Sequence, residues 1–320
     1  MSPINLPTKC PRHNCGRYQP FYFLLAAFRN FDAQIIIQCC LQTNYVATLY
    51  IRIMFKLILS LFLICSTLLV NAQHPPIFPA MTTDSSFVKV SNLDITLVKY
   101  SYKPNGIKFL VVHDNEDTGV KAGFDYIRWS GGELIDSQYG GVRDYYFTYM
   151  DDQYRIDPNA IYTEVGVKTR LKKDFFSSNE VEKAILNAGK QIVDFYDPKA
   201  TGYFLTLHNN ADGGFGISSY LPGYDLASTA DSVYINFQMD GDDLVYVTEP
   251  RLFSSLKKAN VNVILQSKFV SNDGSLSVYA MQNNIPYINV EVQHGHLDEN
   301  LRLIELAIAA LKEHGLVKKE

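Results

Sequence analysis

The chain has 320 residues, of which 47% are hydrophobic and 19% are charged, and its formal net charge is −4. Residues 1–72 hold six of the 29 Lys and Arg residues and one of the 33 Asp and Glu residues, so residues 73–320 carry a net charge of −9. This acidic balance, together with the lack of a basic stripe with interleaved aromatic residues, argues against nucleic acid as a partner.

A signal-peptide pattern occupies residues 54–72. Lys56 precedes an apolar run over 57–70, and Asn71-Ala72-Gln73 provides a small residue at a polar boundary. The run is shorter than the ~20 residues of a membrane-spanning helix, so we predict cleavage and a secreted or periplasmic protein without stable membrane insertion, with anchoring as the alternative. Residues 1–53 are predicted to be a spurious or unstructured extension, with a genuine leader as the alternative.

All five cysteines precede residue 73, so the exported part contains neither disulfides nor thiolate metal ligands. Its fold must therefore depend on an ordinary hydrophobic core. Residues 73–320 are long enough to form one, and we predict a single catalytic domain over this range.

Apolar runs and helical stripes alternate along this domain. We expect a hairpin at 87–90 and 95–100, a buried strand at 107–113, and a helix at 120–129. A second helix follows a capping box at Ser177 and Glu180, carries an apolar stripe at Val181, Ile185, Ala188 and Ile192, and stops at Asp197-Pro198. One further strand is predicted to end at His208, and others are predicted at 232–237, 244–247, 261–266, 275–280 and 287–292. A last helix is predicted at 299–313.

This order of elements predicts the α/β class: a single domain with a mixed, mostly parallel twisted sheet and helices on both faces. In such sheets, ligands bind beyond the carboxyl ends of the strands. His113, His208 and Glu291 are all predicted to lie at such ends.

These strand ends carry residues that suit a zinc site. His113 and Glu116 follow the apolar run 107–112, and His208 follows the run 203–207. Zinc accepts His nitrogen and carboxylate oxygen at ~2.0–2.2 Å, and a catalytic zinc keeps three protein ligands and one open position. Glu291 is flanked by Val290 and Val292, so burial would raise its pKa and favour a role as a base.

The order of these residues over 107–296 resembles the zinc carboxypeptidase superfamily, especially its succinylglutamate desuccinylase and aspartoacylase-like branch. The resemblance implies a zinc carboxypeptidase-like fold with one zinc ion per chain, bound by His113, Glu116 and His208, and Glu291 as the general base. It also implies an arginine that polarises the scissile carbonyl, for which Arg143 is the nearest match and Arg155 the second.

The same family commonly has an Asp-x-Asn-Arg segment whose Asn and Arg hold a substrate carboxylate. Here the segment is Asp157-Pro158-Asn159-Ala160, so Asn159 is retained and the arginine is missing. Arg155, Arg170 or another residue is a candidate substitute for substrate binding. Asn209, His294 and His296 are further candidate substrate-binding residues, with metal ligation or a supporting role as alternatives for the two histidines.

Together these features predict an exported zinc-dependent hydrolase that cleaves a peptide or other amide bond, with cell-wall peptide as a candidate substrate. The alternatives are an N-acetylmuramoyl-L-alanine amidase, a deacylase of N-acyl amino acids, and a non-catalytic binding protein on a hydrolase scaffold. The close spacing of His113 and Glu116 argues against the first, and the presence of Glu291 with all three ligands argues against the last.

Overall fold

The computed structural model describes residues 54, 56, 77–174 and 178–317, and it divides the chain into two units, residues 1–71 and 72–320. In the first unit only Met54 and Lys56 are described, so the predicted extension and nearly all of the predicted signal peptide lie outside the described residues. Among the described helices, none combines the length and apolar character needed to cross a membrane.

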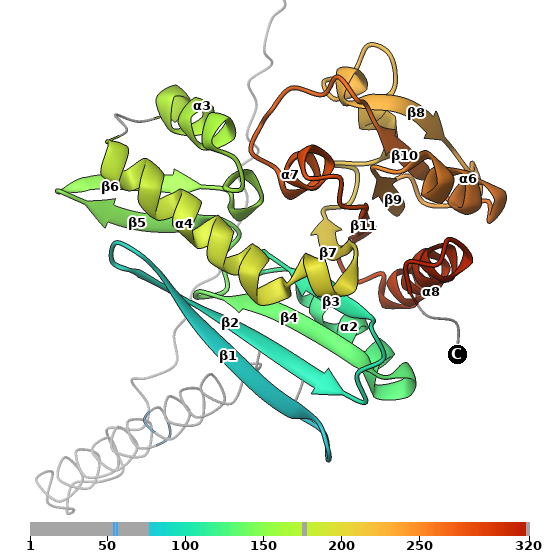
Figure 1. Ribbon diagram of the computed structural model, residues 1–320, viewed down its shortest axis with the longest axis horizontal. Helices are drawn as coiled ribbons and strands as arrows, with labels where there is room; N and C mark the ends of the chain where they lie inside the picture. Colours follow the sequence, from blue (N-terminus) through green and yellow to red (C-terminus); the bar gives the residue numbers. More distant parts are fainter. Residues whose placement is uncertain (1–53, 55, 57–76, 175–177, 318–320) are drawn as a thin grey trace, which may run out of the picture. The chain divides into compact units, whose positions relative to one another are not determined.

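The second unit is built on a nine-stranded sheet with the order β1-β2-β4-β3-β7-β11-β9-β10-β8 (Figure 1). Its strands are β1 (Thr82–Val90), β2 (Leu93–Tyr102), β3 (Lys108–Val111), β4 (Gly132–Gln138), β7 (Phe204–Asn210), β8 (Ala230–Tyr234), β9 (Leu244–Val247), β10 (Val263–Gln266) and β11 (Tyr287–Gln293). A separate antiparallel pair consists of β5 (Tyr145–Tyr149) and β6 (Asp152–Ile156).

The centre of the nine-stranded sheet is parallel. Strands β4, β3, β7 and β11 pair in parallel, as do β9 and β10. Antiparallel pairing joins β1 to β2, β2 to β4, β11 to β9 and β10 to β8. The predicted α/β domain with a mixed sheet is confirmed, and its parallel centre brings the carboxyl ends of three buried strands to one edge.

Helices cover both faces of this sheet. One core contains apolar residues of α3 (Glu164–Asp174), α4 (Asn179–Tyr196) and α7 (Leu276–Gln282), and the other contains those of α2 (Asp117–Ser130), α6 (Pro250–Lys258) and α8 (Leu297–Glu313). Strand β3 serves both cores, since Leu110 faces the first and Phe109 the second. A strand buried on two faces has no polar side, which explains why the run at 107–112 is apolar except for Lys108. The Lys108 ammonium group donates to the carbonyl of Tyr196 at 2.9 Å and pairs with Glu133.

Helix α4 carries the predicted apolar stripe, and all four stripe residues are buried. Its N-cap is Ser178, whose Oγ accepts a hydrogen bond from the backbone N–H of Val181 at 3.2 Å. The predicted cap one residue earlier, Ser177, is therefore wrong. The helix ends at Asp197, in the left-handed conformation with φ 56°, and the next four residues form the short α5 (Pro198–Thr201).

The predicted strand at 275–280 is wrong, because this segment forms α7. Ser275 caps the helix by accepting a hydrogen bond from the N–H of Val278, and Leu276, Val278 and Ala280 are buried. Apolar residues at alternate positions over so short a run fit a strand and one helical turn equally well. Their spacing alone therefore could not distinguish the predicted strand from the helix. The sequence interpretation also omitted β4, the β5–β6 pair, α3, α6 and three 3-10 turns, η1 (Pro158–Ala160), η2 (Ile217–Tyr220) and η3 (Ala227–Thr229).

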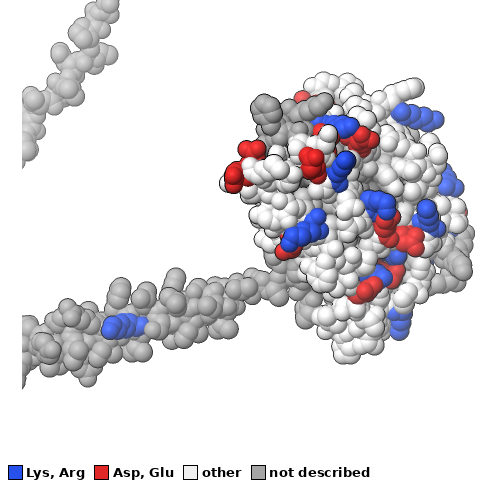
Figure 2. All heavy atoms as spheres, turned by 60° about the vertical axis from the view of Figure 1, so that its left-hand side comes forward, with Lys and Arg blue, Asp and Glu red and all other residues white. Residues whose placement is uncertain are grey.

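Charged side chains of both signs alternate on the face that Figure 2 shows. Among the described helices, ion pairs one helical turn apart include Lys121 with Asp125 and Lys190 with Asp194. Such exposed pairs contribute only ~0.3–0.5 kcal/mol each, so the hydrophobic cores carry the stability of this unit.

A close backbone contact joins α3 to the segment before α7. A Cβ atom added at Gly166 would lie 2.0 Å from the Cα of Gly274. Gly274 has φ +87°, and its carbonyl accepts the backbone N–H of Tyr162 at 3.0 Å. We therefore expect Gly166→Ala to lower the free energy of unfolding by about 1–3 kcal/mol through overpacking, as measured by denaturant unfolding.

Thr169→Ala is the matched control, because Thr169 is exposed on the same helix. Its effect on the free energy of unfolding should stay within about 0.5 kcal/mol. Equal stability of the two variants would contradict the close contact between Gly166 and Gly274.

Candidate metal centre

Three neighbouring segments deliver the predicted metal ligands. His113 lies two residues after β3, Glu116 lies immediately before the first turn of α2, and His208 lies in β7. Strands β3 and β7 pair in parallel with Leu110 opposite Thr206. The apolar parts of both strands are buried in the cores, so their polar ends are held next to each other at the sheet edge.

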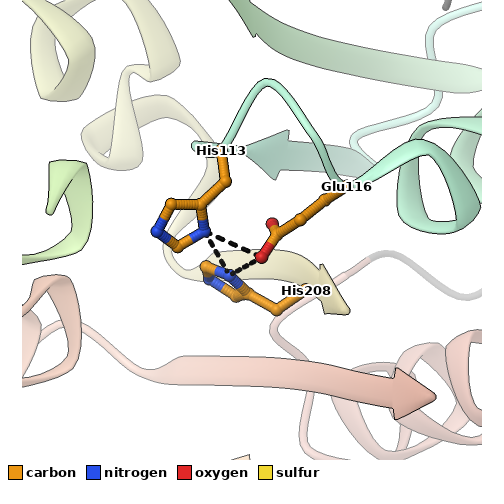
Figure 3. Close-up of side chains that lie close together, drawn as sticks. All are labelled: His113, Glu116 and His208. Carbon is orange, nitrogen blue, oxygen red and sulfur yellow. Dashed lines mark hydrogen bonds and ion pairs between the residues drawn. The ribbon is translucent and has the colours of Figure 1, made fainter. Parts of the chain in front are cut away.

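The three side chains converge on one point (Figure 3). His113 Nδ1 lies 2.8 Å from Glu116 Oε1, His208 Nδ1 lies 3.1 Å from the same oxygen, and the two Nδ1 atoms are 3.1 Å apart. All three residues are buried. Two imidazole nitrogens and one carboxylate oxygen that face one another could hold a divalent metal ion, because zinc is one of the ions that accept such ligands.

The buried polar atoms around this point are incompletely satisfied by protein groups. Glu116 Oε2 and His208 Nε2 have no hydrogen-bond partner among the described residues. A buried carboxylate with an unpaired oxygen is costly unless a cation compensates it. The residues present therefore fit a metal ion.

Neighbouring charges shift the pKa values of His113 and Glu116 in the directions that oppose the effect of burial. Burial alone would lower the pKa of His113, but the carboxylates of Glu116 and Asp157 outweigh burial and raise this pKa to about 9. Burial would raise the pKa of Glu116, but the charges of His113 and His208 hold it far below its usual range. The site thus keeps an ionised carboxylate in the protein interior, as a metal ligand requires.

Asp157 supports His113 from the side opposite the ligand atom. Its Oδ1 lies 2.8 Å from His113 Nε2 and accepts the backbone N–H of Asn159 at 2.7 Å. A carboxylate on the second nitrogen of a metal-ligating histidine fixes the tautomer and the ring orientation. In the sequence, Asp157 belongs to the segment Asp157-Pro158-Asn159-Ala160 of the family resemblance, which implies no role for it. The run Asp157-Pro158-Asn159 is a turn signal, but nothing in it indicates contact with His113.

Glu291 lies beside the three ligands. It is directly opposite His208 in the parallel register of β11 and β7, and only 8% of its surface is exposed. Its Oε2 accepts a hydrogen bond from Asn289 Nδ2 at 3.1 Å. Burial raises the pKa of Glu291, the charge of His208 opposes this, and the charge of Glu116 adds to it.

Arg143 reaches the same cluster from the loop between β4 and β5. Its Nη1 donates to Glu116 Oε1 at 3.3 Å, and its Nη2 lies 3.7 Å from Asp157 Oδ2. Its side chain is half exposed. Burial would lower the pKa of this guanidinium, but the carboxylates of Glu116, Asp157 and Glu291 raise it, so Arg143 is charged.

A cavity of about 910 Å³ lies beside this cluster. Of the predicted site residues, it is lined by Arg143, Asn159, His208, Asn209, Glu291 and His294. Asn210 and Phe215, from the polar and glycine-rich stretch that follows His208 and that the sequence also indicates as part of the site, line it as well. Lining residues that were not predicted from the sequence are Asn115, Asp117, Gly141, Ala211 and Asn289. Most lie within a few residues of a predicted ligand or base, so proximity in sequence was the one signal that could have found them.

Two predicted substrate-binding residues do not line this cavity. Arg155 forms an ion pair with Asp144 and is largely exposed. His296 is bound to Asp243 instead, with Nδ1 2.9 Å from Oδ2. It belongs to a second, more exposed group with Asp240 and Asp243, whose potential ligand atoms lie within 4.8 Å of one another.

No protein-family model matches the chain, and no curated protein matches it significantly. Among solved structures, it is similar to a protein assigned as a metallopeptidase from Shewanella denitrificans OS217, at 14% identity over 72% of this chain and 84% of that one, with a TM-score of 0.34. It is also similar to murein-tripeptide amidase MpaA from Escherichia coli O157, at 12% identity over 75% and 95% of the two chains, with a TM-score of 0.39.

A protein assigned as a metallopeptidase from Shewanella amazonensis SB2B is similar at 10% identity over 74% of this chain and 88% of that one, with a TM-score of 0.35. These similar structures are thus two proteins assigned as metallopeptidases and one amidase.

Asp157 provides a test of the metal centre. We expect Asp157→Asn to weaken zinc binding about 10- to 100-fold, because the amide cannot hold His113 Nε2–H as the carboxylate does. The measurement is competition for zinc with a chelator of known affinity. Asp152→Asn, at an exposed position on β6, should bind zinc as the unmodified chain does, and equal affinity of the two variants would exclude the supporting role of Asp157.

Proposed function

We propose that the chain is a zinc-dependent hydrolase that cleaves a peptide or other amide bond. The observation that carries this proposal is the register of β11 and β7, which sets the buried carboxylate of Glu291 beside His208 and so beside the convergent atoms of His113 and Glu116. A metal ligand set with a separate buried carboxylate next to it is the arrangement required for hydrolysis by an activated water.

His113 Nδ1, Glu116 Oε1 and His208 Nδ1 would hold the zinc ion. When bound, zinc would supply Lewis-acid activation of a water molecule and of the scissile carbonyl. Asp157 would keep the His113 ring in the tautomer that presents Nδ1 to the metal. The cavity beside these residues would admit the substrate.

Glu291 would act as general base and then as general acid. Its carboxylate would take a proton from the attacking water and pass it to the nitrogen of the leaving amine. Burial raises the pKa of Glu291 and thereby favours this proton transfer near neutral pH. The hydrogen bond from Asn289 leaves Oε1 available for the water.

Arg143 would stabilise the negative charge that develops on the carbonyl oxygen. Its guanidinium already lies within 3.3 Å of Glu116 and is half exposed towards the cavity that it lines. A fixed cationic donor at this place acts where charge appears during the reaction.

We further propose that the substrate is recognised without a free terminal carboxylate. Ala160 stands in place of the arginine that would bind one, and it is buried. Arg143 is the single Lys or Arg among the residues that line the cavity, and it is engaged by Glu116 and Asp157. Arg155, the predicted substitute, is paired with Asp144. An amide inside a longer peptide, such as a cell-wall peptide met after export, suits this site better than an N-acyl amino acid.

Glu291→Gln tests the chemistry. We expect the variant to keep its zinc and to lose about 10²- to 10⁴-fold in kcat, because glutamine cannot accept the proton of the water. The measurement pairs elemental analysis with hydrolysis of a panel of peptides and N-acyl amines. The exposed Glu305→Gln on α8 is the control and should retain full activity. Zinc binding without any turnover in the unmodified chain would instead indicate a binding protein.

A pair of substrates tests the recognition. A peptide and its carboxy-terminal amide should be cleaved with kcat/KM values within about threefold, because Arg143, the one Lys or Arg among the described residues that line the cavity, is already paired with Glu116 and Asp157. A preference of 100-fold or more for the free acid would show that the site binds a terminal carboxylate after all.

A further inference from the structure

Asp114 lies between the two ligands His113 and Glu116 but belongs to a different network. Its side chain is buried, with 3% exposed. Its Oδ2 accepts hydrogen bonds from the backbone N–H groups of Tyr139 and Gly141, the second at 2.7 Å. The carboxylate is therefore used to hold the loop that follows β4.

Tyr139 adds side-chain hydrogen bonds between the loop and the segment that carries Asp114. Its hydroxyl accepts the backbone N–H of Asp114 at 3.1 Å and donates to the carbonyl of Arg143 at 2.7 Å. Its ring packs edge-on against the buried ring of Tyr145, with centroids 4.7 Å apart. The loop is thus fixed at Tyr139, at Gly141 and at the backbone of Arg143.

This loop would otherwise be free to adopt several conformations. Gly140 and Gly141 have φ values of 106° and 73°, which residues with a Cβ atom adopt only with strain. Two consecutive glycines lose much backbone entropy when the loop becomes ordered. Hydrogen bonds to a buried carboxylate offset this free-energy cost, because charge-assisted hydrogen bonds are stronger than those between neutral groups. Asp114 supplies two of these bonds from the segment that carries two metal ligands.

The guanidinium of Arg143 depends on this backbone. Its contacts with Glu116 and Asp157, at 3.3 and 3.7 Å, are long for charge-assisted bonds, and the side chain is half exposed. Side-chain contacts alone therefore do not lock its position, which is set mainly by the backbone of the loop.

We propose that Asp114 is a positioning residue that places Arg143 relative to the metal ligands. It does so through the backbone N–H groups of Tyr139 and Gly141 and through the hydroxyl of Tyr139. This inference rests on the proposed function, in which Arg143 stabilises the developing oxyanion. It assigns Asp114 to catalysis through Arg143 and not to metal binding.

The test is a double-mutant cycle of Asp114→Asn and Arg143→Ala, with kcat, KM and zinc content measured for each variant. We expect Asp114→Asn to lower kcat about 10- to 100-fold with KM and zinc content nearly unchanged, as a misplaced oxyanion donor would. In the Arg143→Ala background, the same change should cost less than about twofold, since the residue through which it acts is already absent.

Tyr139→Phe repeats the test with an uncharged change and covers the case in which Asp114→Asn fails to fold. It removes the bonds of the hydroxyl group to the Arg143 carbonyl, the Val112 carbonyl and the Asp114 N–H. Its loss of kcat should also disappear in the Arg143→Ala background. Asp136→Asn is the control for general destabilisation, because Asp136 is another buried carboxylate, on β4, bonded to Gln138. It should leave kcat unchanged under conditions in which it is folded.

Equal losses of kcat with and without Arg143, for both Asp114→Asn and Tyr139→Phe, would overturn the positioning role. Loss of zinc from Asp114→Asn would also overturn it, because Asp114 would then act on the ligand segment. Failure of the proposed function gives a different result, namely no zinc-dependent hydrolysis in the unmodified chain, and it would overturn both proposals.

Discussion

The parallel pairing of β3, β7 and β11 is the constraint on which the site depends. In a sheet with parallel strands, every strand ends at the same edge, so residues far apart in sequence meet there without a dedicated loop. Residues 113, 208 and 291 are brought together in this way, with His208 opposite Glu291 in the register. A shift of one residue in either strand would turn one of these two side chains to the other face.

The same edge concentrates charge that the interior could not otherwise tolerate. Glu116, Asp157 and Glu291 lie around two imidazoles and one guanidinium. The charges of these neighbours shift the pKa of each of the three carboxylates. A proton on His113 compensates the carboxylates in the metal-free chain, and a divalent ion would take the place of that proton. Metal binding should therefore be coupled to proton release.

Short segments serve more than one purpose in this arrangement. His113 and Glu116 point to the candidate metal position, whereas Asp114 between them points to the loop that carries Arg143. Asp157 likewise connects His113 with the turn at Asn159, which lines the cavity. The candidate catalytic groups and the groups that position them thus share one set of loops at the sheet edge.

The positions of the main strands and of the candidate metal ligands could be predicted from the sequence, because both depend on local patterns. A largely apolar run is expected to be buried on both faces, and the polar residue that ends it is expected to lie at an edge, which located His113 and His208. The stripe of α4 was readable for the same reason. Short elements could not be predicted in this way, because the apolar alternation at 276–280 fits a helical turn as well as a strand.

What the tertiary structure alone decided is which polar groups meet. Asp157 supports His113, Arg155 is paired with Asp144, and His296 is bound to Asp243, although the sequence alone gave no sign of these three pairings. Hydrogen bonds and ion pairs between distant segments depend on the distance between atoms in three dimensions. Hydrophobic patterns determine which residues are buried, but only the completed packing determines which charges lie within reach of one another.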